Sequence, residues 1–161
     1  LKPHEFQALL THSTPEALPA IVLGGFCGLR SSEIVSLDWS AIDFATKKIT
    51  VSSGKTNRSR VIPIPNAAAA WLVPIAKDAG PIIPSHVAYS TAAEKVWKAA
   101  GVKRQPNILR TSVGSYMFAA AYNVLMTASE LGISPQHLET HLKNSISKED
   151  IEAWFNIYPR S

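Results

Sequence analysis

Basic side chains gather in two segments of the chain that contain no acid. The members of the two segments are Lys47, Lys48, Lys55, Arg58 and Arg60, and Lys95, Lys98, Lys103, Arg104 and Arg110. If the two segments converge on one face, they supply the phosphate-neutralising patch that a nucleic-acid-binding protein needs. The alternative is an ordinary solvated surface, because the formal net charge is a modest +4.

Gly54, Lys55 and Thr56 look like the end of a phosphate-binding Walker loop. That loop requires a glycine five residues before Gly54, where this chain has Ile49. It also requires a helix after the lysine, whereas a basic turn and a strand are predicted here. We therefore expect no nucleotide site.

His137 and His141 are four residues apart on a predicted helix, the spacing that places two imidazoles on one face for a metal ion. No third ligand accompanies them, since Glu139 lies two residues from His137 and so points to a different face. The pattern favours solvent-facing histidines over a metal site. We expect no metal and no other cofactor.

With 161 residues, 46% of them hydrophobic, the chain is long enough for one domain with a single core. It begins with Leu1 and enters helix-like sequence at once, so we expect the native protein to continue upstream. No segment has the length of a membrane span or the pattern of a secretory leader, which predicts a cytoplasmic protein without a membrane partner. A lone Cys27 in an apolar stretch is expected to be buried.

Caps and prolines predict the elements that position these residues. Helices are expected over residues 3–10, from Ser13 and Pro15 to Phe26, and over 31–37. Residues 47–51 and 60–64 form a predicted β-hairpin, with Lys55 and Arg58 near its tip. Further helices are predicted over 66–78, 86–100, 106–123, 125–131, 134–143 and 147–156. The predicted fold is mainly α with a small antiparallel β-sheet (α+β).

Arg30 lies in a segment that resembles the first arginine box of the tyrosine recombinases of the phage-integrase type. An apolar helix and Gly28 precede it, and Glu33, an aliphatic residue and Trp39 follow. The predicted hairpin is similar to the family's, with Lys55 as the turn lysine. Arg110 matches the second arginine box, and the sequence around Gly132 matches the family's Leu-Gly-His-Ser box. The order of these motifs along the chain is what makes the resemblance specific.

The resemblance implies a reaction in which a tyrosine attacks the scissile phosphate of DNA. Arg30 and Arg110 would hold the non-bridging oxygens, because a guanidinium stays charged and donates in a planar fork. Lys55 would protonate the departing oxygen. A single integrase-type catalytic domain over residues 1–161 is implied, with the family's upstream core-binding domain outside this sequence.

Three positions depart from the family's pattern. Asn107 stands where the second box has histidine, and Ile133 stands where the family has histidine or tryptophan. The nucleophilic tyrosine, nine residues further on, is Leu142, which has no atom that can attack phosphorus. Tyr158 is a candidate for a displaced nucleophile, although packing of an aromatic anchor is favoured there. For Tyr116 and Tyr122, packing against the core is favoured by their helical spacing.

We therefore expect a domain that binds double-stranded DNA and has lost the ability to cut it. The expected DNA-binding residues are Arg30, Lys55, Arg58, Arg60, Lys103, Arg104 and Arg110. One alternative is an active recombinase with a non-standard or partner-supplied nucleophile. A second alternative is a protein-interaction module that assembles with active recombinases, and a homo-oligomer on DNA through the C-terminal helix remains open.

Overall fold

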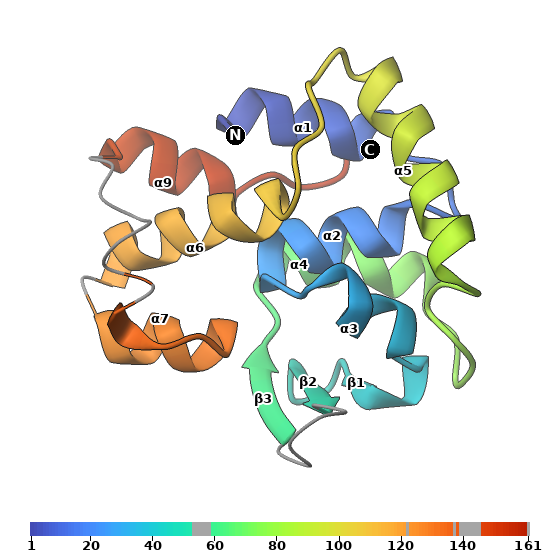
Figure 1. Ribbon diagram of the computed structural model, residues 1–161, viewed down its shortest axis with the longest axis horizontal. Coiled ribbons are helices and arrows are strands. Elements are labelled where there is room, and N and C mark those ends of the chain that lie inside the picture. The colour runs from blue at the N-terminus through green and yellow to red at the C-terminus, as the bar shows by residue number, and fades with distance from the viewer. Residues whose placement is uncertain (53–58, 122, 137, 139–145, 161) are drawn as a thin grey trace.

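The computed structural model describes residues 1–52, 59–121, 123–136, 138 and 146–160 (Figure 1). Its helices are α1 (Pro3–Thr11), α2 (Leu18–Cys27), α3 (Ser31–Ser36), α4 (Asn66–Leu72), α5 (His86–Ala99), α6 (Ile108–Ala121), α7 (Val124–Leu131) and α9 (Lys148–Phe155), with short 3-10 turns η1 (Trp39–Ala41) and η2 (Val73–Ile75). Its strands are β1 (Ile42–Asp43), β2 (Lys48–Ser52) and β3 (Ser59–Pro63). The prediction of a mainly helical fold with a small sheet is confirmed.

Helix α2 is the central element. Every residue from Pro19 to Cys27 is buried, as expected for a helix that is apolar on all sides. Helices α1, α3, α4 and α6 pack around it, as Figure 1 shows. The prediction that Cys27 is buried is confirmed, and burial raises the pKa of its thiol to about 12. A framework of helices therefore holds the ends of α2 and α3 in place.

The three strands form an antiparallel sheet in the order β1-β2-β3. Strand β2 alternates exposed and buried residues, and its Ile49 pairs with Ile62 on β3, so both side chains enter the core. The predicted hairpin is confirmed. The prediction missed β1, because a strand of two residues has too few positions to show an alternating pattern.

Two helix boundaries were predicted wrongly, and prolines explain both. Helix α2 begins at Leu18 and not at Pro15, because Pro19 has no N–H to donate and is tolerated only in the first turn. Helix α4 ends at Leu72 and not at Asp78, because Pro74 cannot continue an α-helix and the chain tightens into η2.

Aromatic rings fasten α9 to the core. Trp154 stacks on Phe6 and on Tyr116, with ring centroids 4.4 Å and 4.3 Å apart, and its indole N–H donates to the Gly25 carbonyl over 3.1 Å. Ser147 caps this helix as predicted, accepting from the Asp150 amide. The core-packing prediction for Tyr116 is therefore confirmed.

The prediction that Tyr158 anchors the tail is wrong. Its side chain is 44% exposed, whereas the neighbouring Ile157 is buried. The carbonyl of Ile157 accepts a hydrogen bond from Trp71 over 2.8 Å. An aliphatic residue and a backbone carbonyl thus secure the tail in place of the aromatic ring.

Several predicted features lie outside the described residues. They are the hairpin turn with Lys55 and Arg58, the histidines His137 and His141 that were expected to face solvent, Tyr122, Leu142, and most of the predicted helix 134–143. Separately, no helix in the described part of the chain combines the length and the apolar character needed to cross a bilayer.

Candidate anion-binding site

Arg30 stands at the start of α3, where the chain leaves α2 through a left-handed Gly28. Its backbone N–H donates to Glu33 Oε2 over 2.8 Å, and its Nη1 donates to Glu33 Oε1 over 3.0 Å. Its Nη2 donates to the Gly132 carbonyl over 3.0 Å. The side chain remains 39% exposed, so part of its guanidinium faces solvent.

Arg110 lies in the first turn of α6 and is only 9% exposed. Its Nη1 donates to the Gly28 carbonyl and its Nη2 donates to the Leu131 carbonyl. Burial lowers the pKa of Arg110 to about 10, and repulsion from Arg30 acts in the same direction. The guanidinium therefore keeps its charge at neutral pH although it is buried.

Arg60 enters the same site from strand β3. Its Nη1 and Nη2 donate to the two oxygens of Glu33 over 2.8 Å and 3.0 Å, a bidentate ion pair. Its Nε donates to the Glu130 carbonyl over 3.1 Å. With 18% of the Arg60 side chain and 12% of the Glu33 side chain exposed, this pair is largely shielded from solvent.

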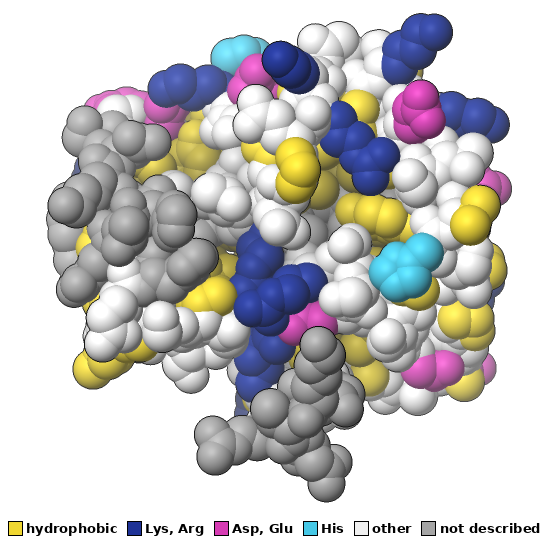
Figure 2. Space-filling model, viewed as in Figure 1, with side chains coloured by type: hydrophobic (Ala, Val, Ile, Leu, Met, Phe, Trp, Pro, Cys, Tyr) yellow, Lys and Arg dark blue, Asp and Glu magenta, His cyan; other side chains and the backbone are white. Residues whose placement is uncertain are grey.

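The C-terminal end of α7 joins the three arginines. Three consecutive carbonyls each accept a hydrogen bond from a different guanidinium: Glu130 from Arg60, Leu131 from Arg110, and Gly132 from Arg30. The C-terminus of a helix carries a partial negative charge, which stabilises nearby cations. We call these three arginines the arginine cluster. Figure 2 shows basic side chains gathered near the middle of one face, with an acidic side chain beside them.

Glu33 is the acid that balances the arginine cluster. Burial alone would raise the pKa of its carboxyl group, but the hydrogen bonds from Arg60 and from the Arg30 amide, with the charges of both side chains, lower that pKa to about 2. Glu33 is thus ionised at neutral pH. Three cations facing one carboxylate leave the site with a net positive charge.

The other residues that the sequence singled out lie outside the arginine cluster. Asn107 stands exposed just before α6, in the left-handed region with φ 57°. Arg104 and Lys103 are exposed on the loop before it. Ile133 follows Gly132 and packs, half-buried, against a small second apolar cluster. The structure therefore brings Arg30, Arg60 and Arg110 together, while Lys55, Arg58 and Leu142 are outside the described residues.

The sequence analysis missed the contributions of Glu33 and of the α7 carbonyls. Glu33 does carry a signal, because an acid three residues after Arg30 lies on the same side of a helix. Its pairing with Arg60 crosses 27 positions and has no local signature. Backbone carbonyls have none at all, since every residue type provides one.

The residues of this site are chemically suited to an anion. A guanidinium has five N–H donors, and Arg30 uses two of them on side-chain and carbonyl partners among the described residues. The others are available to a phosphate oxygen, whose planar, charge-assisted hydrogen bonds suit arginine. In the described part of the chain no group of three or more His, Cys, Asp or Glu side chains is placed to hold a metal ion.

Comparisons with known proteins agree with the fold. The model of the Phage integrase family matches residues 1–132. Among solved structures, the chain is similar to the crystal structure of XerA recombinase (TM-score 0.73, 18% identity, 100% of this chain and 65% of that chain). It is also similar to the integrase from mycobacterium phage Brujita (TM-score 0.69, 17% identity, 98% and 57%). The chain thus spans less than two thirds of either protein. No curated protein sequence matches it.

Proposed function

Because this chain belongs to the phage integrase family, we propose that it binds the phosphate backbone of double-stranded DNA through the arginine cluster and does not cut the DNA. The observation that carries the proposal is the meeting of Arg30 and Arg110, 80 positions apart in the sequence, at one carbonyl-lined helix end. The single carboxylate of Glu33 offsets only part of the charge of the three arginines, and the remaining positive charge favours an anion at this site.

The arginines have different roles in this proposal. Arg30 contacts phosphate directly, because its guanidinium is partly exposed. Arg110 contributes charge from a buried position and fixes the geometry. Arg60 holds Glu33 and supports the site, which makes it a weaker phosphate contact than the sequence alone suggests. The hairpin residues Lys55 and Arg58, with Lys103 and Arg104 before α6, extend the contact along the DNA.

The absence of cleavage follows from residue chemistry. Leu142 occupies the family's tyrosine position and has no nucleophilic atom. Asn107 can hydrogen-bond to a phosphate oxygen but cannot exchange protons near neutral pH, and Ile133 can do neither. The retained arginines therefore bind a phosphate that no group in these positions attacks.

Binding of a labelled DNA duplex, measured by fluorescence anisotropy over a range of salt concentrations, tests this proposal. We expect the logarithm of the association constant to fall linearly with the logarithm of the salt concentration. Arg30→Ala should lower the magnitude of that slope by about one, as loss of one phosphate contact requires. Lys55→Ala should act in the same way.

Lys148→Ala is the matched control, since it removes an equal charge from a side chain that is 84% exposed on α9. We expect this variant to keep the wild-type slope. If wild type shows no salt-dependent binding, or if Arg30→Ala and Lys148→Ala have equal slopes, the arginine cluster is not the DNA-binding site.

A further inference from the structure

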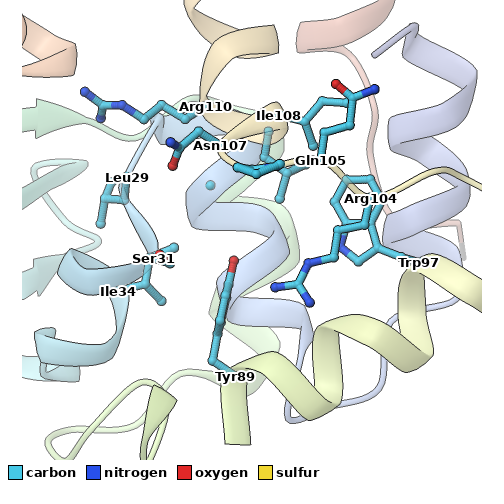
Figure 3. Close-up of a pocket in the computed structure, with 13 residues that line it drawn as sticks. Leu29, Ser31, Ile34, Tyr89, Trp97, Arg104, Gln105, Asn107, Ile108 and Arg110 are labelled. Atoms are coloured by element: carbon cyan, nitrogen blue, oxygen red, sulfur yellow. The ribbon is translucent and has the colours of Figure 1, made fainter. Parts of the chain in front are cut away.

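A second feature lies beside the arginine cluster: a cavity of about 170 Å³ between α3, α5 and the start of α6 (Figure 3). Arg110 lines one end, and Ser31, the neighbour of Arg30, lines a wall. Any phosphate held by the cluster therefore lies next to the cavity. None of the family positions discussed above accounts for it, apart from Asn107 and Arg110 at its edge.

The far side of the cavity is aromatic. Tyr89 and Trp97 of α5 both line it, the first half-buried and the second 4% exposed. The guanidinium carbon of Arg104 lies 6.0 Å from the centroid of the Tyr89 ring, within the range of a cation–π contact. Arg104 thus places a further positive charge at the cavity. An aromatic surface with a cation beside it suits the flat, aromatic base of a negatively charged nucleic-acid strand.

Polar groups that lack partners line the same cavity. Within the part of the chain that the structure describes, no hydrogen bond engages the Tyr89 hydroxyl or the side-chain amides of Gln105 and Asn107. Figure 3 shows the Tyr89 hydroxyl directed towards the middle of the cavity and the Asn107 side chain beside Arg110. An amide offers both a donor and an acceptor, the combination displayed by the edges of the DNA bases.

The backbone of Asn107, at the edge of the cavity, has an unusual conformation. Its φ of 57° is a left-handed conformation that a residue other than glycine adopts at a cost, although asparagine tolerates it better than most. Residues held in this way are enriched at ligand sites. The conformation sets the Asn107 side chain at the rim shared by the cavity and the arginine cluster.

We propose that this cavity accepts a single unstacked nucleobase of a DNA strand whose phosphate is held by the arginine cluster. The inference rests on the proposed function. At about 170 Å³ the cavity is smaller than the roughly 300–1,000 Å³ sites that enclose whole drug-sized ligands. It therefore suits one flat ring system and excludes a complete nucleotide, whose phosphate stays outside with the arginines. Tyr89 provides the stacking surface, and Gln105 and Asn107 contact the base edge.

The test compares two labelled duplexes that differ in one bulged nucleotide. In one duplex the bulge carries adenine, and in the other it is abasic, so both have the same backbone and the same number of phosphates. Fluorescence anisotropy should give an affinity for the adenine bulge that is about tenfold higher, since stacking of a base on an aromatic side chain contributes roughly 1–3 kcal/mol. Tyr89→Ala should abolish this difference, and Tyr89→Phe should keep most of it.

Tyr158→Ala is the matched control, because it removes a tyrosine that is 44% exposed in the tail and lines none of this cavity. Equal affinity of the wild-type protein for the two bulges would overturn the inference and leave the proposed function intact. A preference that survives in Tyr89→Ala would overturn it as well. Failure to bind either duplex in a salt-dependent way would instead overturn the proposed function, and the inference with it.

Discussion

Arg60 and Glu33 form a bidentate ion pair, 2.8 Å and 3.0 Å between their hydrogen-bonded atoms, that joins strand β3 to helix α3. Arg60 also donates to a carbonyl of α7, and Glu33 also accepts from Arg30. A single pair of side chains thus connects the hairpin strand, the first arginine box and the end of α7. The pair thus contacts both Arg30 and the end of α7.

Breaking this pair on one side should destabilise the fold. In Arg60→Ala the carboxylate of Glu33 loses its strongest partner. We expect the free energy of unfolding to fall by roughly 2–4 kcal/mol, somewhat less than for a fully buried pair. Chemical denaturation measures this free energy. The exposed Lys148–Glu152 pair, 3.8 Å apart, provides the comparison. Lys148→Ala should change stability by less than about 1 kcal/mol, and equal effects of the two variants would contradict a connecting role for Arg60.

The same pair predicts a dependence of stability on acid pH. The pKa of Glu33 falls from 4.5 to about 2 on folding, so the folded state binds the proton less readily than the unfolded state. The resulting stabilisation is complete above pH 4.5 and is lost as the pH falls towards 2. Urea denaturation at a series of pH values measures the decline. Glu33→Gln has no such carboxyl group and should show a shallower decline, and an identical one would mean that Glu33 is not ionised in the fold.

Gly28 permits a close approach that the arginine cluster needs. Its φ is 66°, and an added Cβ would lie 2.5 Å from the Leu131 side chain. Its carbonyl also accepts from Arg110. Gly28→Ala should therefore cost the roughly 1–2 kcal/mol of a left-handed alanine and a further 1–3 kcal/mol for overpacking.

Gly101→Ala separates these two contributions. Gly101 has a similar φ of 67°, but no atom lies within 4 Å of the position of its Cβ. Thermal or chemical denaturation should show a clearly smaller loss for Gly101→Ala than for Gly28→Ala. Equal losses would show that backbone strain alone, and not contact with Leu131, makes glycine necessary at position 28.

Local signals in the sequence predicted the elements that carry the site. The cap at Ser147 and the hairpin strands were visible because each depends on residues a few positions apart. Helix boundaries next to prolines in apolar stretches were predicted less accurately, as the start of α2 near Pro19 and the end of α4 before Pro74 show. The missed strand β1 owes its structure to pairing with β2 and not to its own two residues.

The candidate site itself was only partly visible. Arg30 and Arg110 were found through a resemblance, and the structure brings them to the same helix end. What holds them there could not be read from the sequence, because it consists of backbone carbonyls and of a pairing between distant residues. The cavity wall formed by Tyr89 and Trp97 was also missed, because α5 and α3 are distant in the sequence and meet only in the folded chain.

The proposed loss of cleavage can be tested by restoring the family's residues. Leu142→Tyr alone should not suffice, because a phenol with a pKa near 10 needs help with proton transfer, which typically contributes about 10² to 10⁴ in rate. Under the proposed function, the triple variant Asn107→His, Ile133→His, Leu142→Tyr should form a covalent adduct with a nicked suicide duplex, because Arg30 and Arg110 already lie together at one helix end. Denaturing gel electrophoresis detects the adduct. Adding Arg30→Ala to the triple variant should abolish it, which controls for attack outside the arginine cluster. The unmodified protein should form none, and an adduct mapped to Tyr158 or to any other side chain of that protein would overturn the proposal that this chain binds DNA without cutting it.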